Sequence, residues 1–285
     1  MIVTVAVVQM VATAEVAENL AAAALLLDRA AAQGARLVLL PENFALMGRE
    51  ETDKLAIMEA DGEGPIQDWL AAQARRLGLW LVGGSMPLAA GDGRCHAACL
   101  VYDEQGQRRA RYDKIHLFDV DLGGGESYRE SRSIAPGKEP VLVATPWGRM
   151  GLSICYDLRF PELYRAYAGA ELLVVPSAFT QRTGLAHWDV LLRARAIENL
   201  AFVLAADQGG DHDNGRETFG GSQVIDPWGT VLGRLDKGPG VCMAHLDLDF
   251  LGQCRAALPA LEHRRACRPP LITKQYRQNP AVAGS

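Results

Sequence analysis

The chain has 285 residues, of which 49% are hydrophobic and 22% charged, and its formal net charge at pH 7 is −5. This is the composition of a globular protein with ample apolar material for a large core. The negative charge argues against a nucleic-acid partner, and no block of Lys and Arg suggests a polybasic membrane patch. No apolar run approaches the roughly 20 residues of a membrane-spanning helix, so we expect no membrane partner.

The N-terminus, M-I-V-T-V-A-V-V-Q-M, lacks the pattern of a signal peptide and predicts a first β-strand over Val3–Gln9. Six cysteines are spread along the chain without a C-x-x-C, which predicts reduced thiols in a cytoplasmic protein. The pattern closest to a zinc site is Cys95-His96-x-x-Cys99, which we interpret as structural. We therefore expect no metal.

The first half of the chain predicts strands that alternate with helices. A helix over Val16–Gln33 leads into G-A-R-L-V-L-L-P-E-N-F (Gly34–Phe44), and a helix over Ile66–Arg76 leads into a strand over Leu79–Gly84. Short runs of Val and Leu that stop at a proline are typical of parallel strands buried on both faces. A hairpin follows and ends at Lys114.

The second half repeats this order. G-A-E-L-L-V-V-P-S-A-F (Gly169–Phe179) matches the first-half segment, and a second hairpin ends at Lys237, at the same interval from its turn aspartate. The other elements expected in this half are a strand over Met150–Cys155, helices over Leu163–Ala168 and His187–Asn199, and a strand over Ala201–Ala206.

The repeat predicts an α/β fold made of two pseudo-symmetric halves. Right-handed crossovers place both helices of each half on one face of its sheet, and the two bare apolar faces then meet. The expected architecture is an α-β-β-α sandwich. We expect one domain over residues 1–250 and a C-terminal extension, 251–285, that packs on the sandwich or on a partner subunit.

The same repeat indicates where chemistry takes place. It makes Glu42 equivalent to Ser177, and Cys155 equivalent to Gln9, all at the carboxyl ends of parallel strands, where open α/β sheets place their sites. Because the framework matches while these residue types differ, the differences are candidates for chemistry. Cys155, where a strand turns toward a helix, is the candidate nucleophile, and Glu42 is its candidate base.

Three stretches resemble the signatures of the nitrilase superfamily of carbon–nitrogen hydrolases: P-E-N-F, D-K-I-H-L-F-D and I-C-Y-D-L-R-F-P-E-L. The resemblance implies the same sandwich, with Glu42 as general base, Lys114 as oxyanion stabiliser and Cys155 as nucleophile of a thioester mechanism without a cofactor. It also implies an assisting glutamate. Glu130 in Y-R-E-S is favoured over Glu126 in G-G-G-E-S.

The branch follows from residues around and after the nucleophile. Cys155-Tyr156-Asp157 differs from the Cys-Trp-Glu of true nitrilases, which favours an amide substrate, and P-S-A-F-T-Q-R-T-G-L-A-H-W resembles the small Nit amidases. This implies hydrolysis of a primary amide of a small carboxylate-bearing substrate to acid and ammonia. Deaminated glutathione is the expected substrate; α-ketoglutaramate, N-carbamoyl compounds and aliphatic amides are the alternatives. One departure is Asp207, where that branch more often has alanine.

The remaining expectations concern binding and assembly. Substrate-binding candidates are Tyr156, whose N–H is the expected oxyanion donor, Arg182 and His187 on a loop after the Ser177 strand, and Arg216 in the loop Gln208–Thr218. That last loop, with His212, is also expected to provide a distal cationic patch for a longer substrate. Because family members commonly dimerise, we expect a homodimer or larger homo-oligomer.

Two neighbours of the nucleophile, Asp157 and Arg159, are expected to form an ion-pair network with Glu162. Such a network would shape the turn that follows Cys155. We therefore expect these three residues to be structural.

Overall fold

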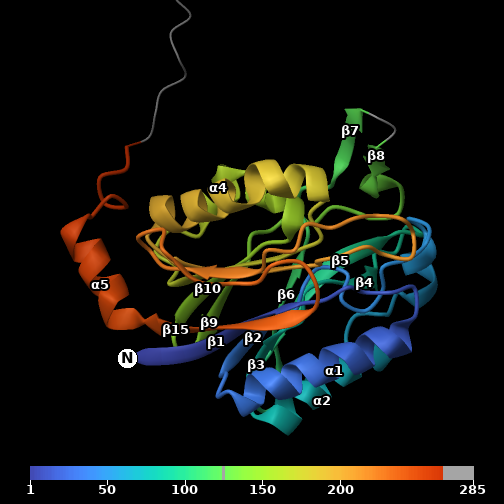
Figure 1. The fold of residues 1–285 in the computed structure, drawn as a ribbon, viewed down its shortest axis with the longest axis horizontal. Coiled ribbons are helices and arrows are strands. Elements are labelled where there is room, and N and C mark those ends of the chain that lie inside the picture. Colours follow the sequence, from blue (N-terminus) through green and yellow to red (C-terminus); the bar gives the residue numbers. More distant parts are fainter. Residues whose placement is uncertain (124–125, 266–285) are drawn as a thin grey trace, which may run out of the picture.

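The computed structural model describes residues 1–123 and 126–265. Two sheets lie face to face between outer layers of helices, and Figure 1 shows α1 and α2 on one side and α4 on the other. The expected α-β-β-α sandwich is therefore confirmed. Among the helices of the described residues, none combines the length and apolar character needed to cross a membrane.

The elements follow the repeat. The first half contains β1 (Ile2–Gln9), α1 (Val16–Ala32), β2 (Leu37–Leu39), η1 (Asp53–Ile57), α2 (Pro65–Leu77), β3 (Trp80–Val82), β4 (Met86–Ala89), β5 (Cys95–Tyr102) and β6 (Arg108–Asp113). Between the halves lie β7 (Asp119–Gly123), β8 (Glu126–Arg129) and η2 (Glu130–Arg132). The second half contains β9 (Leu142–Thr145), β10 (Gly148–Leu152), η3 (Cys155–Arg159), α3 (Pro161–Ala166), β11 (Leu172–Ser177), α4 (Gln181–Asn199), β12 (Phe202–Asp207), β13 (Gln223–Ile225) and β14 (Val231–Arg234), followed by β15 (Gly240–Asp247) and α5 (Leu248–Ala257).

Each sheet is built around three parallel strands. The first has the order β15-β1-β2-β3-β5-β4, with β6 beside β5, and the second has the order β14-β13-β12-β11-β10-β9. The pattern of side chains explains why β1 is buried on both faces: Val3, Val5 and Val7 belong to the core between the sheets, whereas Ala6 and Val8 belong to the core beneath α1 and α2. The repeat did not predict β15, which pairs antiparallel with β1 along its whole length.

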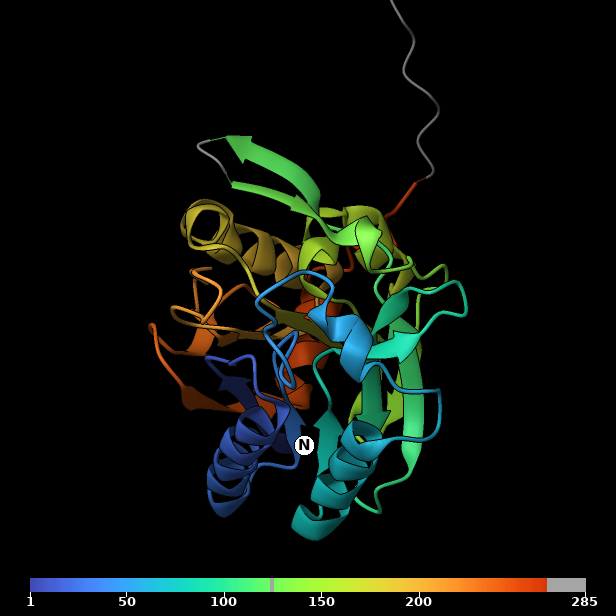
Figure 2. The ribbon, with the colours of Figure 1, turned by 90° about the vertical axis from the view of Figure 1, so that its right-hand side faces the viewer.

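The expected start of the long second-half helix was wrong. Helix α4 begins at Gln181, six residues before the predicted start, because the Thr180 hydroxyl accepts a hydrogen bond from the Thr183 N–H at 3.3 Å and caps the helix. Arg182 and His187 therefore lie in a helix and not on a loop. Figure 2 shows the β7–β8 ribbon standing out from the body of the molecule above α4.

The C-terminal extension starts inside a helix. In α5, Leu251 and Cys254 are buried, and the Arg255 guanidinium donates to the carbonyls of Leu200 (3.0 Å) and Ala170 (2.5 Å). This part of the extension packs on its own chain. Its remainder beyond residue 265, including any contact with a partner, lies outside the described residues.

Candidate active site

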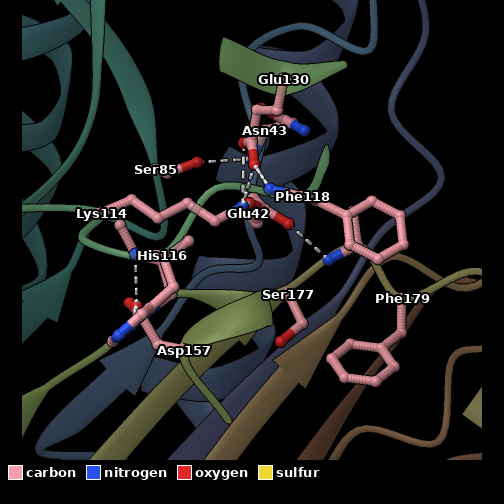
Figure 3. A network of polar contacts seen from close by, with 12 residues as sticks. Glu42, Asn43, Ser85, Lys114, His116, Phe118, Glu130, Asp157, Ser177 and Phe179 are labelled. Atoms are coloured by element: carbon pink, nitrogen blue, oxygen red, sulfur yellow. Dashed lines mark hydrogen bonds and ion pairs between the residues drawn. The ribbon is translucent and has the colours of Figure 1, made fainter. Parts of the chain in front are cut away.

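Glu42 lies just beyond the carboxyl end of β2 and is buried. Its Oε1 accepts from the Lys114 ammonium at 2.8 Å, and its Oε2 accepts from the backbone N–H of Ala178 at 2.9 Å (Figure 3). Only glycine fits at position 84, beside this segment, because a Cβ there would lie 2.0 Å from the Pro41 carbonyl oxygen. Both carboxylate oxygens are thus held by partners from other parts of the fold.

Lys114, directly after β6, reaches from one glutamate to another. Its Nζ lies 2.8 and 3.0 Å from the two oxygens of Glu130, which also accepts from the Phe118 N–H at 2.6 Å (Figure 3). Burial lowers the pKa of Lys114, but Glu130 and Glu42 outweigh it and hold that pKa well above the usual value. Burial raises the pKa of Glu130, but the attraction of Lys114 exceeds this, so the net shift is downward.

The two candidate assisting glutamates occupy different surroundings. Glu130 contacts the Lys114 ammonium, whereas Glu126 on β8 accepts a hydrogen bond from the Tyr128 hydroxyl at 3.1 Å. Only Glu130 lines the same pocket as Glu42 and Lys114. The geometry therefore favours Glu130.

Cys155 begins the 3-10 turn η3 with a φ of 48°, a left-handed conformation that is uncommon for residues other than glycine. Asp157 holds this turn. One of its oxygens accepts from the Ile154 N–H (2.9 Å) and the Tyr112 hydroxyl (2.7 Å), and the other from the N–H and Nδ1 of His116 (3.0 and 2.7 Å). The turn therefore presents the thiol at the end of the strand segment.

The expected ion-pair network of Asp157, Arg159 and Glu162 is not present in the described part of the chain. Asp157 is fully occupied by the contacts that shape the turn. The Arg159 guanidinium instead lies 5.8 Å from the centre of the Tyr156 ring and 5.4 Å from that of Phe179. Asp157 thus pairs with His116, from the segment after β6, and not with Arg159 or Glu162.

The pKa of the Cys155 thiol is raised well above its ordinary value. Burial is the main cause, the Glu42 carboxylate adds to it, and Lys114 opposes it. In the resting site the sulfur is accordingly a thiol, and a neighbouring base has to remove its proton before it can attack.

One small pocket, with a cavity volume of about 40 Å³, is lined by Glu42, Lys114, Glu130 and Cys155 together. Two of the predicted substrate-binding residues, Tyr156 and Arg216, also line it. The other lining residues were not predicted from the sequence: Asn43, Glu51, Lys54, Phe118, Tyr128, Arg159, Ala178, Phe179, Thr180 and Thr183. Of these, Asn43, Phe118 and Arg159 stood within the family signatures, whereas Lys54 carried no sequence signal.

Arg182 and His187 do not line this pocket. The Arg182 guanidinium donates to the Leu122 carbonyl at 2.6 Å, and the His187 Nδ1 lies 3.2 Å from Arg159. His212 is also absent, because its ring is buried between the Ala12 carbonyl and the Thr218 hydroxyl, both at 2.8 Å. The structure therefore places all three side chains outside this pocket, with Arg182 and His187 on α4 and the His212 ring against Ala12 and Thr218.

The pseudo-symmetric partners of the site are structural. Gln9, the counterpart of Cys155, donates to the Gly238 carbonyl at 2.6 Å and accepts from the Ser222 N–H at 2.9 Å. Ser177, the counterpart of Glu42, is buried in β11. The repeat therefore supplies one set of catalytic residue types and not two.

Asp207 is a buried carboxyl behind the pocket. One oxygen accepts from the Phe179 N–H at 2.8 Å, and the other has no hydrogen-bond partner. Burial raises the pKa of Asp207 well above its ordinary value, and the Glu42 carboxylate raises it further. Asp207 thus contacts the Ala178–Phe179 segment that holds Glu42.

The sequence model of the carbon-nitrogen hydrolase family matches residues 4–256. The chain belongs to this family. Its sequence is 43% identical over 265 residues to a deaminated glutathione amidase from Synechocystis, covering 91% of this chain and 97% of that one. It is also 43% identical over 273 residues to the human deaminated glutathione amidase, covering 92% and 82%.

Solved structures of other carbon–nitrogen hydrolases have the same fold. NitFhit from Caenorhabditis elegans superposes with a TM-score of 0.84 at 39% identity, covering 93% of this chain and 65% of that chain. Nit3 from Saccharomyces cerevisiae, a member of branch 10 of the nitrilase superfamily, superposes with 0.83 at 28% identity, covering 90% and 94%. A mutant of an amidase from Nesterenkonia, with acrylamide added at its active site cysteine, gives a TM-score of 0.76 at 31% identity, covering 90% of this chain and 98% of that chain. The expected family is therefore confirmed.

Proposed function

We propose that this protein is a cysteine amidase that hydrolyses deaminated glutathione. The observation that carries the proposal is the convergence of Glu42, Lys114, Glu130 and Cys155 on one pocket. Further support comes from the two deaminated glutathione amidases, which are 43% identical to nearly the whole chain, and from the acrylamide adduct at the active site cysteine of the Nesterenkonia amidase.

In the proposed acylation step, Glu42 takes the proton of the Cys155 thiol as sulfur attacks the amide carbon. The high thiol pKa makes this transfer necessary. The Lys114 ammonium, held by Glu130, and the Tyr156 N–H stabilise the oxyanion, because the first N–H groups of a helical turn have no partner within the turn. Glu42 then delivers the proton to the leaving nitrogen, and the C–N bond breaks.

A thioester between Cys155 and the acyl group remains. Water replaces the amine, and Glu42 removes a proton from it as the water oxygen attacks the thioester carbon. Collapse of the intermediate releases the carboxylic acid, and the proton returns to sulfur. No step requires a group other than these side chains, the backbone N–H and water.

The covalent structure of deaminated glutathione corrects the expectation that the enzyme cleaves a primary amide and releases ammonia. This compound is a 2-oxo acid joined by an amide to cysteinylglycine, so its amides are secondary. The group that leaves is then the amine of a dipeptide, and ammonia leaves only from α-ketoglutaramate, the primary amide of the same acyl group. Both substrates give the same thioester.

Cations around the pocket support an anionic substrate. Arg159 and Arg216 line the pocket, and neither guanidinium forms an ion pair with a carboxylate of the described residues. Lys54 lies beside them and pairs with Glu51 at 3.3 Å. A carboxylate-bearing substrate would complete the charge balance.

A competitive hydrolysis panel tests the proposal. It contains deaminated glutathione, α-ketoglutaramate, glutamine, an N-carbamoyl amino acid and an aliphatic nitrile, and measures kcat/KM for each. We expect the highest kcat/KM on deaminated glutathione. Equal or higher kcat/KM on α-ketoglutaramate would favour an ω-amidase instead.

We also propose a homodimer that works in the cytoplasm. The outer surface of α4 supports the dimer, because Val190 (69% exposed) and Ile197 (45%) are seven positions apart on one helix face, and Trp228 is 57% exposed. Five free cysteines among the described residues support a reducing compartment. Sedimentation equilibrium of the wild type and of Val190→Asp tests the dimer.

A further inference from the structure

A second chamber of about 490 Å³ adjoins the catalytic pocket. The two spaces lie side by side, because five residues line both: Asn43, Glu51, Lys54, Tyr128 and Arg216. A volume of this size is typical of a small-molecule site. The chamber is therefore large enough for a part of the substrate that extends beyond the reacting amide.

Arg216 stands at the boundary between the two spaces. Its guanidinium donates to the Ala178 carbonyl, next to Glu42, and stacks 5.1 Å from the centre of the Tyr128 ring. Its Nε is buried without a hydrogen-bond partner. A guanidinium that is fixed in place and lacks a carboxylate is prepared for an anionic ligand.

Two more cations belong to the outer chamber, and both come from the segment after β2. Lys54 is mostly buried, with 20% of its side chain exposed, and Arg49 is exposed and forms no ion pair in the described part of the chain. Three carboxylates also line the chamber. Glu51 is paired with Lys54, Glu126 accepts from the Tyr128 hydroxyl, and Glu50 is exposed.

We propose that this outer chamber is the subsite for the leaving group, and that it binds amines that end in a carboxylate, such as a dipeptide. This inference rests on the proposed function. Arg216 and Lys54 receive the carboxylate at the inner edge of the chamber, and Arg49 contributes at its rim. The acyl group occupies the pocket beside Cys155, so Arg49, which lines the outer chamber but not that pocket, contacts only the part of the substrate that departs.

The test uses three substrates with one acyl group: deaminated glutathione, its analogue with the glycine carboxylate converted to an amide, and α-ketoglutaramate. All three form the same thioester with Cys155, so they differ only before the amine leaves. For the wild type, we expect conversion of the carboxylate to an amide to lower kcat/KM by about 10-fold or more, the effect of one lost charge-assisted contact.

Variants locate that contact. Lys54→Met and Arg49→Ala should lower kcat/KM on deaminated glutathione, by about 10-fold for Lys54 and less for the exposed Arg49. Arg49→Ala should change kcat/KM on the amidated analogue and on α-ketoglutaramate by less than about twofold. Lys54 also lines the catalytic pocket, so Lys54→Met should lower kcat/KM on all three substrates, but most on deaminated glutathione. Arg36→Ala is the matched control, because Arg36 is an exposed arginine at the opposite end of β2.

The outcomes separate the inference from the proposed function. If the wild type hydrolyses deaminated glutathione and its amidated analogue equally well, the subsite does not bind the carboxylate. The inference is then wrong, while the proposed function stands. An equal loss on all three substrates in Lys54→Met would place this lysine with the acyl group and also overturn the inference. Absence of activity on deaminated glutathione, with activity on α-ketoglutaramate, would overturn both.

Discussion

The backbone N–H of Ala178 donates a hydrogen bond of 2.9 Å to Oε2 of Glu42, although the two residues are 136 positions apart. Glu42 follows a strand of the first sheet and Ala178 follows a strand of the second. The proposed base is therefore oriented by the opposite half of the repeat. The site forms only where the carboxyl ends of parallel strands from the two sheets meet. Substitutions in either half should therefore affect it.

Cys155→Ala should lower kcat by at least about 10³-fold, because no other group in the pocket can form the thioester. The fold should survive, since Asp157 and its partners hold the turn without the sulfur. Activity is measured on α-ketoglutaramate and folding by thermal unfolding. If a correctly folded variant kept most of its activity, Cys155 would not be the nucleophile.

Glu42→Gln should separate reactivity from turnover. Turnover should fall by about 10²- to 10⁴-fold, because glutamine cannot accept the thiol proton. The pKa of Cys155 should fall at the same time, since burial and the Glu42 carboxylate raise it and only the second is removed. Mass spectrometry can follow the rate of Cys155 alkylation by iodoacetamide as a function of pH, with Cys155→Ala as the blank. The midpoint pH of this profile should be lower in Glu42→Gln than in the wild type. An unchanged or higher midpoint would contradict the electrostatic account.

Lys114→Met should destabilise the protein as well as inactivate it. The substitution leaves the buried carboxylates of Glu42 and Glu130 without their shared cation. Breaking a buried ion pair in this way costs about 3–5 kcal/mol of the free energy of unfolding. Urea unfolding monitored by circular dichroism measures the loss. A loss below about 1 kcal/mol, the scale of an exposed pair, would show that the two glutamates do not depend on this ammonium.

Glu130→Gln and Glu126→Gln distinguish the two candidate assisting glutamates. Glu130→Gln should lower kcat on α-ketoglutaramate on the order of 10²-fold, because it loosens the lysine that faces the oxyanion. Glu126→Gln should change it by less than about threefold, because Glu126 contacts the Tyr128 hydroxyl instead. The reverse order of effects would move the assisting role to Glu126.

Asp207→Asn should flatten the pH dependence of stability. The folded-state pKa of Asp207 is raised, so its contribution to stability is complete below the unfolded pKa and is lost as the pH rises toward the folded pKa. Asparagine stays neutral and still accepts from the Phe179 N–H. As the pH rises above 4, the free energy of unfolding of the variant, relative to that of the wild type, should therefore increase by at most about 1.4 kcal/mol per pH unit. Parallel curves from urea unfolding between pH 5 and 8 would show that Asp207 is already ionised.

Local patterns in the sequence were sufficient for much of the fold. Val and Leu runs that stop at proline, as before Glu42, depend on neighbouring residues alone. The Thr180 cap of α4 is equally local, but the predicted start of the helix missed it. The repeat then placed Glu42 and Cys155 at strand ends. Their roles came from the resemblance of three signature stretches to a family, which periodicity by itself does not supply.

Tertiary structure decided which side chains share the pocket. Lys54 and Arg216 both line it although 162 positions separate them. Arg182 and His187 follow closely on pocket residues in the sequence, but they contact Leu122 and Arg159 instead. The pairing of β15 with β1 likewise joins two segments that lie far apart in the sequence. Sequence periodicity reports which face of an element is apolar, but the partner of a polar side chain depends on how distant elements cross, and only the packed sandwich determines that.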